Sequence, residues 1–449
     1  MHGEAGTWVP QVIFGWDAMW VATGILLLTY AVIITEKINR AIVALVGAGL
    51  MVQVGVLDQA EAIRGIDFNT IALLVGMMVI VAITKKCGVF QCVAIWSAKV
   101  VKANPRGILI MLAVVTALLS ALLDNVTTVL LIAPVTLLIT EELKINPYPI
   151  LFAEILASNI GGTATLIGDP PNIIIGSATG LTFNDFVVNL GPIVVPVLAV
   201  TLAIIYAIWR KELVTTVEAR ERVMRFVPGE AITDTRLLKQ SLFVLALVIA
   251  GFILAHPLHM EPGTIAMLGA AILLLLDNFW RKAEDQSHTT HTTFGEVEWI
   301  VIFFFIGLFI VVHGVNASGL LALLGGELVD ATGGDLAVTG LVVLWASALL
   351  SAVIDNIPFV ATMIPIIESL GPMFGGPEAL EPLWWSLSLG ACLGGNGSLI
   401  GASANLAVAG FAERAGYPIK FLRFMLLAFP LMLVSIAMST VYVYFVLMP

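Results

Sequence analysis

The chain has 449 residues, of which 59% are hydrophobic and only 12% are charged. Soluble domains carry about 25% charged residues, so this composition excludes an ordinary soluble protein and indicates a membrane protein. The formal net charge is −10, and the absence of a large basic soluble segment argues against nucleic acid as a partner.

Apolar stretches long enough to cross a bilayer recur along the whole chain. They predict an all-α polytopic membrane protein with ten spans, near residues 17–35, 40–57, 68–84, 148–178, 186–209, 241–256, 263–280, 298–313, 383–410 and 421–447. Two further apolar segments, near 107–140 and 336–370, each contain an Asp-Asn pair, and we predict that they form re-entrant hairpins.

The basic residues predict the orientation, because cytoplasmic loops of membrane proteins carry an excess of Lys and Arg. With the N-terminus outside, all but one of the 21 basic residues fall on the cytoplasmic side, Lys37 and Arg40 among them, and only Arg64 lies outside. We therefore expect a multi-pass protein of the inner (plasma) membrane with both termini outside.

Signatures of enzymes and metal proteins are missing from the sequence. Cys87, Cys92 and Cys392 form no CxxC pair, and no GxxxxGK[ST] phosphate loop occurs. The aspartates of the apolar segments lack the clustered His or Glu partners of a metal centre and the Ser-His arrangement of a hydrolase. We therefore expect no enzyme, no cofactor and no bound metal.

The two halves of the chain repeat one another. A shift of 231 residues superposes Gly76, Gly88, Ser120, Asp124, Asn125 and Pro134 on Gly307, Gly319, Ser351, Asp355, Asn356 and Pro365. A shift of 233 aligns NIGGTATLIGDPPNIIIG (159–176) with CLGGNGSLIGASANLAVAG (392–410). Five crossings per half would turn the second half upside down. This pattern predicts inverted repeats at 1–210 and 241–449, joined by a cytoplasmic linker at 211–240.

Asp124 and Asp355 lie at the tips of the two predicted hairpins. A charged Asp at the centre of a membrane helix costs about 2.5–3.5 kcal/mol on insertion scales, so such residues usually mark ion or proton paths. Asp and Asn are also good helix N-caps, so a purely capping role for these pairs remains an alternative.

The aligned segments after the hairpins contain residues that break a helix in the middle of a span. Gly and Pro cannot sustain a regular helix there, and unwound backbone is tolerated in a membrane only where it lines a cavity. Thr163, Thr165, Asp169 and Asn172 bring polar groups to the first break, and Asn396, Ser398, Ser403 and Asn405 bring them to the second. The alternative is a kinked packing helix without a ligand.

The two breaks differ at one position, since Asp169 corresponds to Ala402. Asp124, Asp169 and Asp355 are accordingly the candidates for proton coupling, with Asp124 first. Glu154, ahead of the first break, is either a proton relay or a side chain that reaches the cytoplasmic surface. Cys392, beside the second break, is either a packing residue or a contact for a thiophilic ligand.

Four stretches, LLDNVTTVLLIAPVT, NIGGTATLIGDPPNIIIG, SAVIDNIPFVATMIPI and GACLGGNGSLIGASAN, resemble the ArsB/NhaD branch of the ion transporter superfamily. They are also similar to the pigmentation-associated P protein. The resemblance implies two inverted repeats, each with a re-entrant hairpin and an interrupted helix, working by alternating access. Arsenical-pump members export arsenite or antimonite in exchange for protons, sometimes beside a separate ATPase subunit, whereas NhaD members exchange sodium for protons.

The resemblance also implies which residues bind the solute. Carried over to this chain, they are Asp124, Asn125, Thr127, Thr128, Asn159, Thr163, Asn172, Asp355, Asn356, Asn396, Ser398 and Asn405. Carboxylate-transporting relatives carry Ser-Asn-Thr triplets at the tips, where this chain has DNVT and DNIP, which weakens a citrate interpretation.

The sequence therefore predicts a secondary transporter for proton-coupled efflux of arsenite or antimonite across the lipid bilayer. A sodium/proton antiporter of the NhaD type and a channel or anion transporter like the P protein remain the alternatives.

Overall fold

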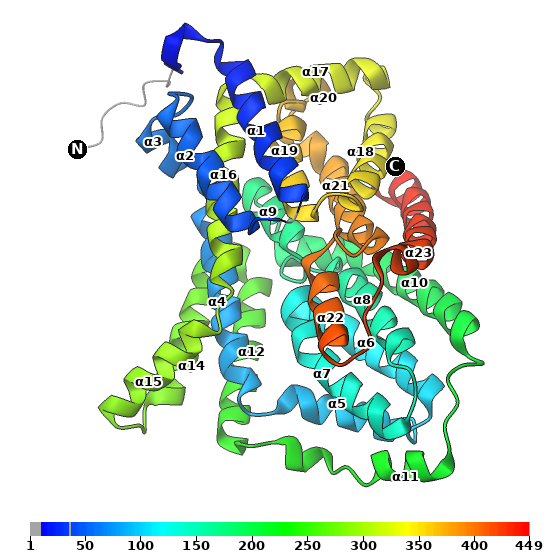
Figure 1. Cartoon of the computed structure of the whole chain (residues 1–449). Coiled ribbons are helices and arrows are strands. Elements are labelled where there is room, and N and C mark those ends of the chain that lie inside the picture. Colours follow the sequence, from blue (N-terminus) through cyan, green and yellow to red (C-terminus); the bar gives the residue numbers. More distant parts are fainter. Residues whose placement is uncertain (1–9, 36, 449) are drawn as a thin grey trace.

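The computed structural model describes residues 10–35 and 37–448, and the regular elements of that part of the chain are all helical (Figure 1). The first ten α-helices are α1 (Ala18–Ile34), α2 (Arg40–Gln53), α3 (Gln59–Arg64), α4 (Phe68–Lys85), α5 (Val89–Val100), α6 (Pro105–Leu122), α7 (Asn125–Leu143), α8 (Tyr148–Gly162), α9 (Pro170–Thr179) and α10 (Phe183–Trp209). The remaining ones are α11 (Val217–Met224), α12 (Thr235–Ile253), α13 (Ala255–Leu258), α14 (Pro262–Asn278), α15 (Ala283–Gly295), α16 (Trp299–Ala317), α17 (Leu320–Thr332), α18 (Leu336–Ser351), α19 (Asn356–Glu368), α20 (Gly371–Phe374), α21 (Glu381–Gly394), α22 (Ser403–Arg414) and α23 (Phe421–Tyr442). The predicted all-α membrane protein is confirmed.

Local sequence explains where many of these helices begin. The side chains of Asp17, Asp67 and Asp234 accept backbone N–H groups at the starts of α1, α4 and α12. Such capping satisfies donors that have no partner within the helix. Gly88 and Gly319, which align in the repeat, precede α5 and α17 with φ of +79° and +87°, a conformation that glycine adopts without strain.

Helices of the two halves pack on each other through aligned glycines. The α4 helix packs on α14, and α16 packs on α2. A Cβ atom at Gly76 of α4 would lie 2.6 Å from the backbone of Ala266, and one at Gly307 of α16 would lie 2.6 Å from the backbone of Ala44. Because these contacts admit no side chain, glycine at both positions lets the two helix pairs approach closely.

Both apolar segments with an Asp-Asn pair fold as two helices that meet at that pair. The α6 and α7 helices are separated only by Leu123 and Asp124, and α18 and α19 are separated by residues 352–355. In Figure 1 the α6–α7 pair lies in the lower half of the molecule and the α18–α19 pair in the upper half. The helices that follow the two breaks, α9 and α22, each pack on the hairpin of the other half. The α9 helix packs on α19, and α22 packs on α7. This exchange brings the two tips and the two breaks together.

The number of long apolar helices differs from the ten predicted spans. Seven of the described helices are long and apolar enough to cross a membrane, or eight if α17 and α18, bent by 116°, count as one span. The difference arises because α1, α2 and α14 have only 14 to 17 residues. Two further predicted spans are divided into α8–α9 and α21–α22. Conversely, α6 and α7, predicted as parts of a re-entrant hairpin, have 18 and 19 residues and are long enough to span.

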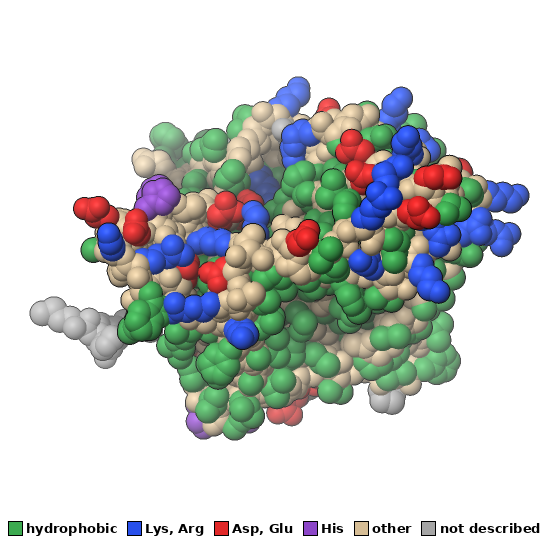
Figure 2. All heavy atoms as spheres, turned by 90° about the horizontal axis from the view of Figure 1, so that it is seen from below, with side chains coloured by type: hydrophobic (Ala, Val, Ile, Leu, Met, Phe, Trp, Pro, Cys, Tyr) green, Lys and Arg blue, Asp and Glu red, His purple; other side chains and the backbone are tan. Residues whose placement is uncertain are grey.

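Several predicted loops contain helices instead. The α5 and α15 helices lie between predicted membrane segments, and α11 lies in the predicted linker. Figure 2 shows many Lys, Arg, Asp and Glu side chains on the face that lies at the bottom of Figure 1, where α5, α11 and α15 are found.

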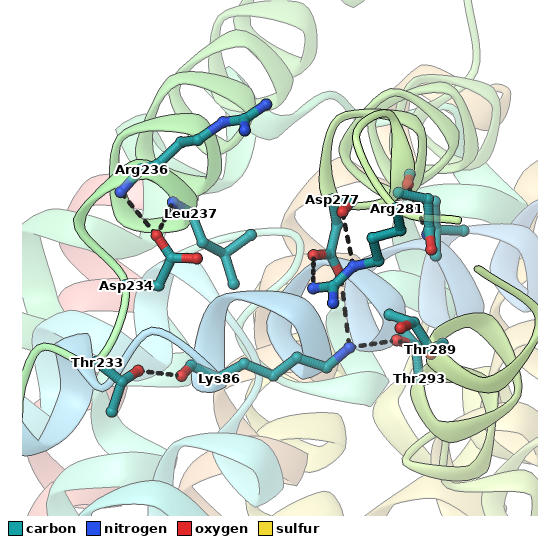
Figure 3. Close-up of polar contacts among 11 residues, drawn as sticks. Lys86, Thr233, Asp234, Arg236, Leu237, Asp277, Arg281, Thr289 and Thr293 are labelled. Atoms are coloured by element: carbon teal, nitrogen blue, oxygen red, sulfur yellow. Dashed lines mark hydrogen bonds and ion pairs between the residues drawn. The ribbon is translucent and has the colours of Figure 1, made fainter. Parts of the chain in front are cut away.

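Ion pairs tie the helices together on this face, as Figure 3 shows. The buried carboxyl group of Asp277 lies 2.8 Å from Arg281 and 3.6 Å from Lys86, whose ammonium group donates to the Thr293 hydroxyl at 2.6 Å. These contacts join the end of α4 to α14 and α15.

Candidate functional site

The first tip is built around a helix cap. The Asp124 carboxyl group is 8% exposed and accepts the backbone N–H of Thr127 at 2.8 Å. The next backbone N–H, that of Asn125, donates to the carbonyl of Gly168 in the first break at 3.1 Å. Capping is therefore one role of Asp124, and it fixes the tip against the broken helix.

The second tip has the same cap and a further partner. Asp355 accepts the backbone N–H of Ile357 through Oδ1 at 3.1 Å, while its Oδ2 lies 2.5 Å from Nη1 of Arg40. The guanidinium also lies over the ring of Phe304, 4.9 Å from its centroid. The charge pattern predicts Arg40 on the cytoplasmic side, and the structure places its guanidinium against the second tip.

Each broken helix is attached to the neighbouring hairpin by equivalent hydrogen bonds. Four hydroxyls donate to backbone carbonyls at 2.6–2.7 Å: Ser120 to Ser158, Ser351 to Ala391, Thr165 to Ala121 and Ser398 to Ala352. The predicted binding residue Ser398 thus uses its hydroxyl to hold the break in place, and Thr163 donates to the carbonyl of Asn159 one turn earlier in α8.

Two asparagines satisfy the backbone that the breaks set free. The Asn172 amide donates to the carbonyls of Thr163 and Thr165, and the Asn405 amide donates to those of Gly395 and Ser398. Unwound backbone inside a membrane protein is stable only with such partners.

Four asparagine side chains from both halves form one buried network. Asn125 donates to Asn159 at 3.1 Å, and Asn159 donates to both Asn396 and Asn405 at 2.9 Å. All four side chains are at most 3% exposed. The predicted amides of the first tip and of both broken helices therefore meet at one place.

Asp169 of the first break contacts the second tip. Its carboxyl group is fully buried, accepts the Asn356 amide at 3.3 Å, and lies within electrostatic range of Asp124 and Asp355. The Cys392 thiol lies beside it. The three aspartates proposed for proton coupling thus lie around one site.

Some buried polar atoms of the site have no hydrogen-bond partner among the described residues. They include Oδ1 of Asn125, Oγ1 of Thr128 and Oδ2 of Asp169. A buried polar atom without a partner costs about 1–3 kcal/mol, and these three atoms can each form a hydrogen bond with a further group. All three belong to the first half of the chain.

Other residues of the site differ from the expectations. Glu154 does not reach the surface: it is 1% exposed and accepts the Thr136 hydroxyl through Oε1. Ser388, which sequence reasoning missed, donates to Oδ1 of Asn172 at 2.6 Å. Its only sequence signal is a serine one turn before Cys392 in an apolar helix. Among the described residues no cluster of three or more His, Cys, Asp or Glu side chains could hold a metal ion.

Comparisons with known proteins agree on the type of protein. Residues 30–390 match the family model CitMHS, described as citrate transporter. The uncharacterized transporter Rv2684 of Mycobacterium tuberculosis is 44% identical over 438 residues, covering 95% of this chain and 99% of the relative. The 46 kDa membrane protein of Mycobacterium leprae is 42% identical over 429 residues, covering 94% of this chain and 98% of that protein.

Two more distant comparisons extend the likeness. The human P protein is 34% identical over 505 residues, which cover 94% of this chain but only 59% of the P protein. Among solved structures, the YdaH transporter of Alcanivorax borkumensis has a TM-score of 0.57 and 14% sequence identity, covering 96% of this chain and 98% of that one. At that identity the likeness concerns the fold alone.

Proposed function

Because this chain belongs to the CitMHS family of the ion transporter superfamily, and is therefore a multi-pass secondary transporter and not an enzyme, we propose that it exports arsenite or antimonite in exchange for protons. The solute would cross as the neutral hydroxide by alternating access. Asp124, Asp169 or both would carry the exchanged proton.

The observation that carries this proposal is the buried polar site where both tips and both breaks meet. Its side chains offer amide, hydroxyl and carboxyl groups, and three of their atoms have no partner among the described residues: Asn125 Oδ1, Thr128 Oγ1 and Asp169 Oδ2. A small trihydroxide has both donors and acceptors, so it can satisfy such atoms without bringing a charge into the membrane.

The charges of the site argue against a multiply charged carboxylate. Asp124 and Asp355 lie within electrostatic range of Asp169, and Arg40, the one cation that the described residues place at the tips, is already paired with Asp355. A citrate ion would therefore meet unbalanced negative charge in a low-dielectric interior, which is strongly repulsive. The family description names citrate, so this solute belongs in the test.

The Cys392 thiol supports a soft metalloid as the solute. It lies beside the Asp169 carboxyl group and 3.5 Å from Oδ1 of Asn172. Thiols bind soft ions well, and trivalent arsenic and antimony are thiophilic. The thiol would favour these solutes over hard oxyanions of similar size.

For the architecture we propose that residues 1–210 and 241–449 are inverted repeats joined by a cytoplasmic linker at 211–240. The equivalent hydroxyl contacts of Ser120 and Ser351 and the equivalent amide contacts of Asn172 and Asn405 support this division. The charged face of Figure 2 would lie in the cytoplasm, because cytoplasmic surfaces are rich in Lys and Arg, and both termini would lie outside the inner membrane.

A sodium/proton antiporter is the second candidate, and the oxygen atoms of the first tip favour it. Asp124, the free oxygens of Asn125 and Thr128, and Asp169 could together surround a hard cation, which prefers oxygen ligands. In that case the same aspartates would alternate between sodium and protons.

The experiment uses purified protein in proteoliposomes with an imposed proton gradient. Arsenite accumulation that an uncoupler abolishes, with no response to Na⁺ or citrate, is the expected result. Collapse of the gradient on addition of Na⁺ without arsenite uptake would establish the antiporter instead. Proton-driven uptake of citrate would overturn the charge argument and identify a carboxylate transporter.

A further inference from the structure

Arg40 occupies a position that local helix chemistry disfavours. It is the first residue of α2, directly after the N-cap Asn39. The N-terminus of a helix carries a partial positive charge, so a cation there is unfavourable by about 0.3–1 kcal/mol. A residue that breaks a local rule is often retained because of a contact elsewhere in the structure.

The equivalent position in the second half obeys the rule. The matching backbone contacts of Gly307 with Ala44 and of Gly76 with Ala266 align α2 with α14. In this alignment Arg40 corresponds to Pro262, the first residue of α14. Proline is among the residues best suited to that position. The cation is therefore an addition to one half, not a feature of the repeat.

Arg40 makes two contacts that account for its place. Its guanidinium is paired with Oδ2 of Asp355 and lies over the Phe304 ring. The side chain is 23% exposed and borders a cavity of about 260 Å³ between the α1–α2 turn, the second tip and the start of α22. A planar guanidinium suits this double contact with a carboxylate and an aromatic face.

The first tip has no such partner. Among the described residues, no Lys, Arg or His nitrogen lies within 4.0 Å of the Asp124 carboxyl group, whereas Asp355 has Arg40. The two aligned aspartates are both buried and both cap a helix, so the counter-charge is the main difference between them.

We propose that the Arg40 guanidinium is a built-in cation that fills the ion site of the second tip, so that only the first tip can take up an exchanged proton. This inference rests on the proposed proton coupling and deepens it. Asp124 with Asp169 forms the single coupling site, and Asp355 stays paired with Arg40 through the transport cycle.

The groups that face Asp355 define what happens when Arg40 is replaced. Among the described residues they are Arg40 itself and the Asp169 carboxyl group across the site, while the Tyr30 hydroxyl of α1 donates to the Pro358 carbonyl next to the tip. Neither Asp169 nor Tyr30 supplies a positive charge. In the Arg40→Gln variant the buried Asp355 carboxylate therefore lacks a counter-charge, and a proton takes the place of the guanidinium.

The first measurement counts carboxyl groups that become protonated on acidification, by the infrared C=O band of purified protein. Arg40→Gln is expected to add one carboxyl group to the wild-type count. The double variant with Asp355→Asn is expected to remove this addition, and Arg40→Lys is expected to keep the wild-type count. Arg281→Gln is the matched control, because it breaks an Arg–Asp pair away from the tips while Asp277 keeps Lys86 as a second cation at 3.6 Å (Figure 3), so the count is expected to stay unchanged.

A second arm keeps the test decisive if Arg40→Gln does not fold. Asp355→Asn alone is expected to retain every carboxyl group that titrates in the wild type. Loss of one band in that variant, or an unchanged count in folded Arg40→Gln, would overturn the proposal.

The transport consequence is measured separately in proteoliposomes, with arsenite as the probe and proton flux recorded in parallel. Arg40→Gln is expected to raise the number of protons exchanged per arsenite by one, and an unchanged ratio would overturn the proposal. If wild-type protein does not transport arsenite at all, the proposed substrate fails, while the infrared count still decides the role of Arg40.

Discussion

The two tips carry the same Asp-Asn pair, yet they are placed in different surroundings. Asp124 and Asp355 both accept backbone N–H groups at the start of a helix, so the local structure of the tips is the same. Asp355 has a guanidinium partner from α2, whereas Asp124 faces a site with free polar atoms. We infer from this difference that the shared tip structure supplies the scaffold, and we propose that Arg40 decides which half can be active.

The polar side chains at the site also differ between the halves, and the first half has more of them at the aligned positions. The first half has Asn159 and Asp169 where the second has Cys392 and Ala402. Thr128 has Phe359 as its counterpart at the shift of 231. The hydroxyls that hold the breaks are present in both halves, whereas the Asn159 amide, the Asp169 carboxyl group and the Thr128 hydroxyl have no counterpart of the same chemistry in the second half.

The largest difference between the tips is expected when Asp is replaced by Asn at each of them in turn. Asp124→Asn is expected to reduce proton-driven uptake to the level of empty vesicles, because the variant lacks the carboxyl group assigned to the exchanged proton. Asp355→Asn is expected to keep the wild-type ratio of protons to solute. It should instead lower the free energy of unfolding by about 1–2 kcal/mol, since Arg40 is left unpaired and is only partly exposed.

Uptake assays and thermal unfolding in detergent measure the two effects side by side. Wild-type uptake by Asp124→Asn would show that the first tip only caps its helix. Complete loss of coupling in Asp355→Asn, with unchanged unfolding temperature, would show that the tips are functionally equivalent.

A smaller loss of uptake is expected when a residue of the first break is replaced by the residue at the aligned position of the second break. Asp169→Ala introduces the residue found at Ala402 and removes the carboxyl group that accepts the Asn356 amide. Leaving the buried Asn356 amide without its acceptor costs about 1–3 kcal/mol, so uptake should fall by about 5- to 100-fold. Ala402→Ser is the matched control, and we expect it to stay near the wild-type uptake. Equal losses in both variants would contradict the assignment of the active half.

Much of the fold follows from the sequence because its signals are local. Apolar length identified the helices, the Asp-Asn pairs identified where α6–α7 and α18–α19 meet, and Gly and Pro identified both breaks. Short or divided helices were the main difficulty: α2 has only 14 residues, and its preceding turn lies against the second tip instead of in a free loop. Such tertiary placement is not encoded in hydropathy.

The site was predictable to the extent that it follows the repeat. The predicted amides of the first tip and of both broken helices meet in one network, but Arg40 lies outside the aligned segments and was counted only as a loop cation. Ser388 carries no motif, and its contact with Asn172 depends on how α21 packs against α9. Residues that act through packing between distant elements leave no periodic or compositional signal.

The shared framework itself gives a prediction in which the halves should respond alike. A Cβ atom at Gly161 would lie 2.2 Å from the carbonyl oxygen of Ala117, and one at Gly394 would lie 2.6 Å from that of Ala348. Alanine at either position should destabilise the protein by about 1–3 kcal/mol through overpacking between hairpin and broken helix. Gly24→Ala, where no atom lies within 4 Å, is the control and should be neutral or stabilising. Thermal unfolding that is sensitive to only one of the two glycines would contradict a symmetric framework.

The smallest expected effect concerns a hydroxyl that only the first half possesses. Thr128 is fully buried, and its Oγ1 has no partner among the described residues, so Thr128→Val keeps the shape of the side chain and removes only the hydrogen-bonding group. If this hydroxyl binds the solute, the KM for arsenite should rise about 3- to 10-fold with an unchanged maximal rate, which corresponds to the net value of one hydrogen bond, about 0.5–1.5 kcal/mol. Thr140→Val is the control on the same helix, because the Thr140 hydroxyl is also buried but donates to the backbone of α7. An equal change of KM in both variants would mean that valine disturbs α7 itself, and an unchanged KM in Thr128→Val would place the solute away from the first tip.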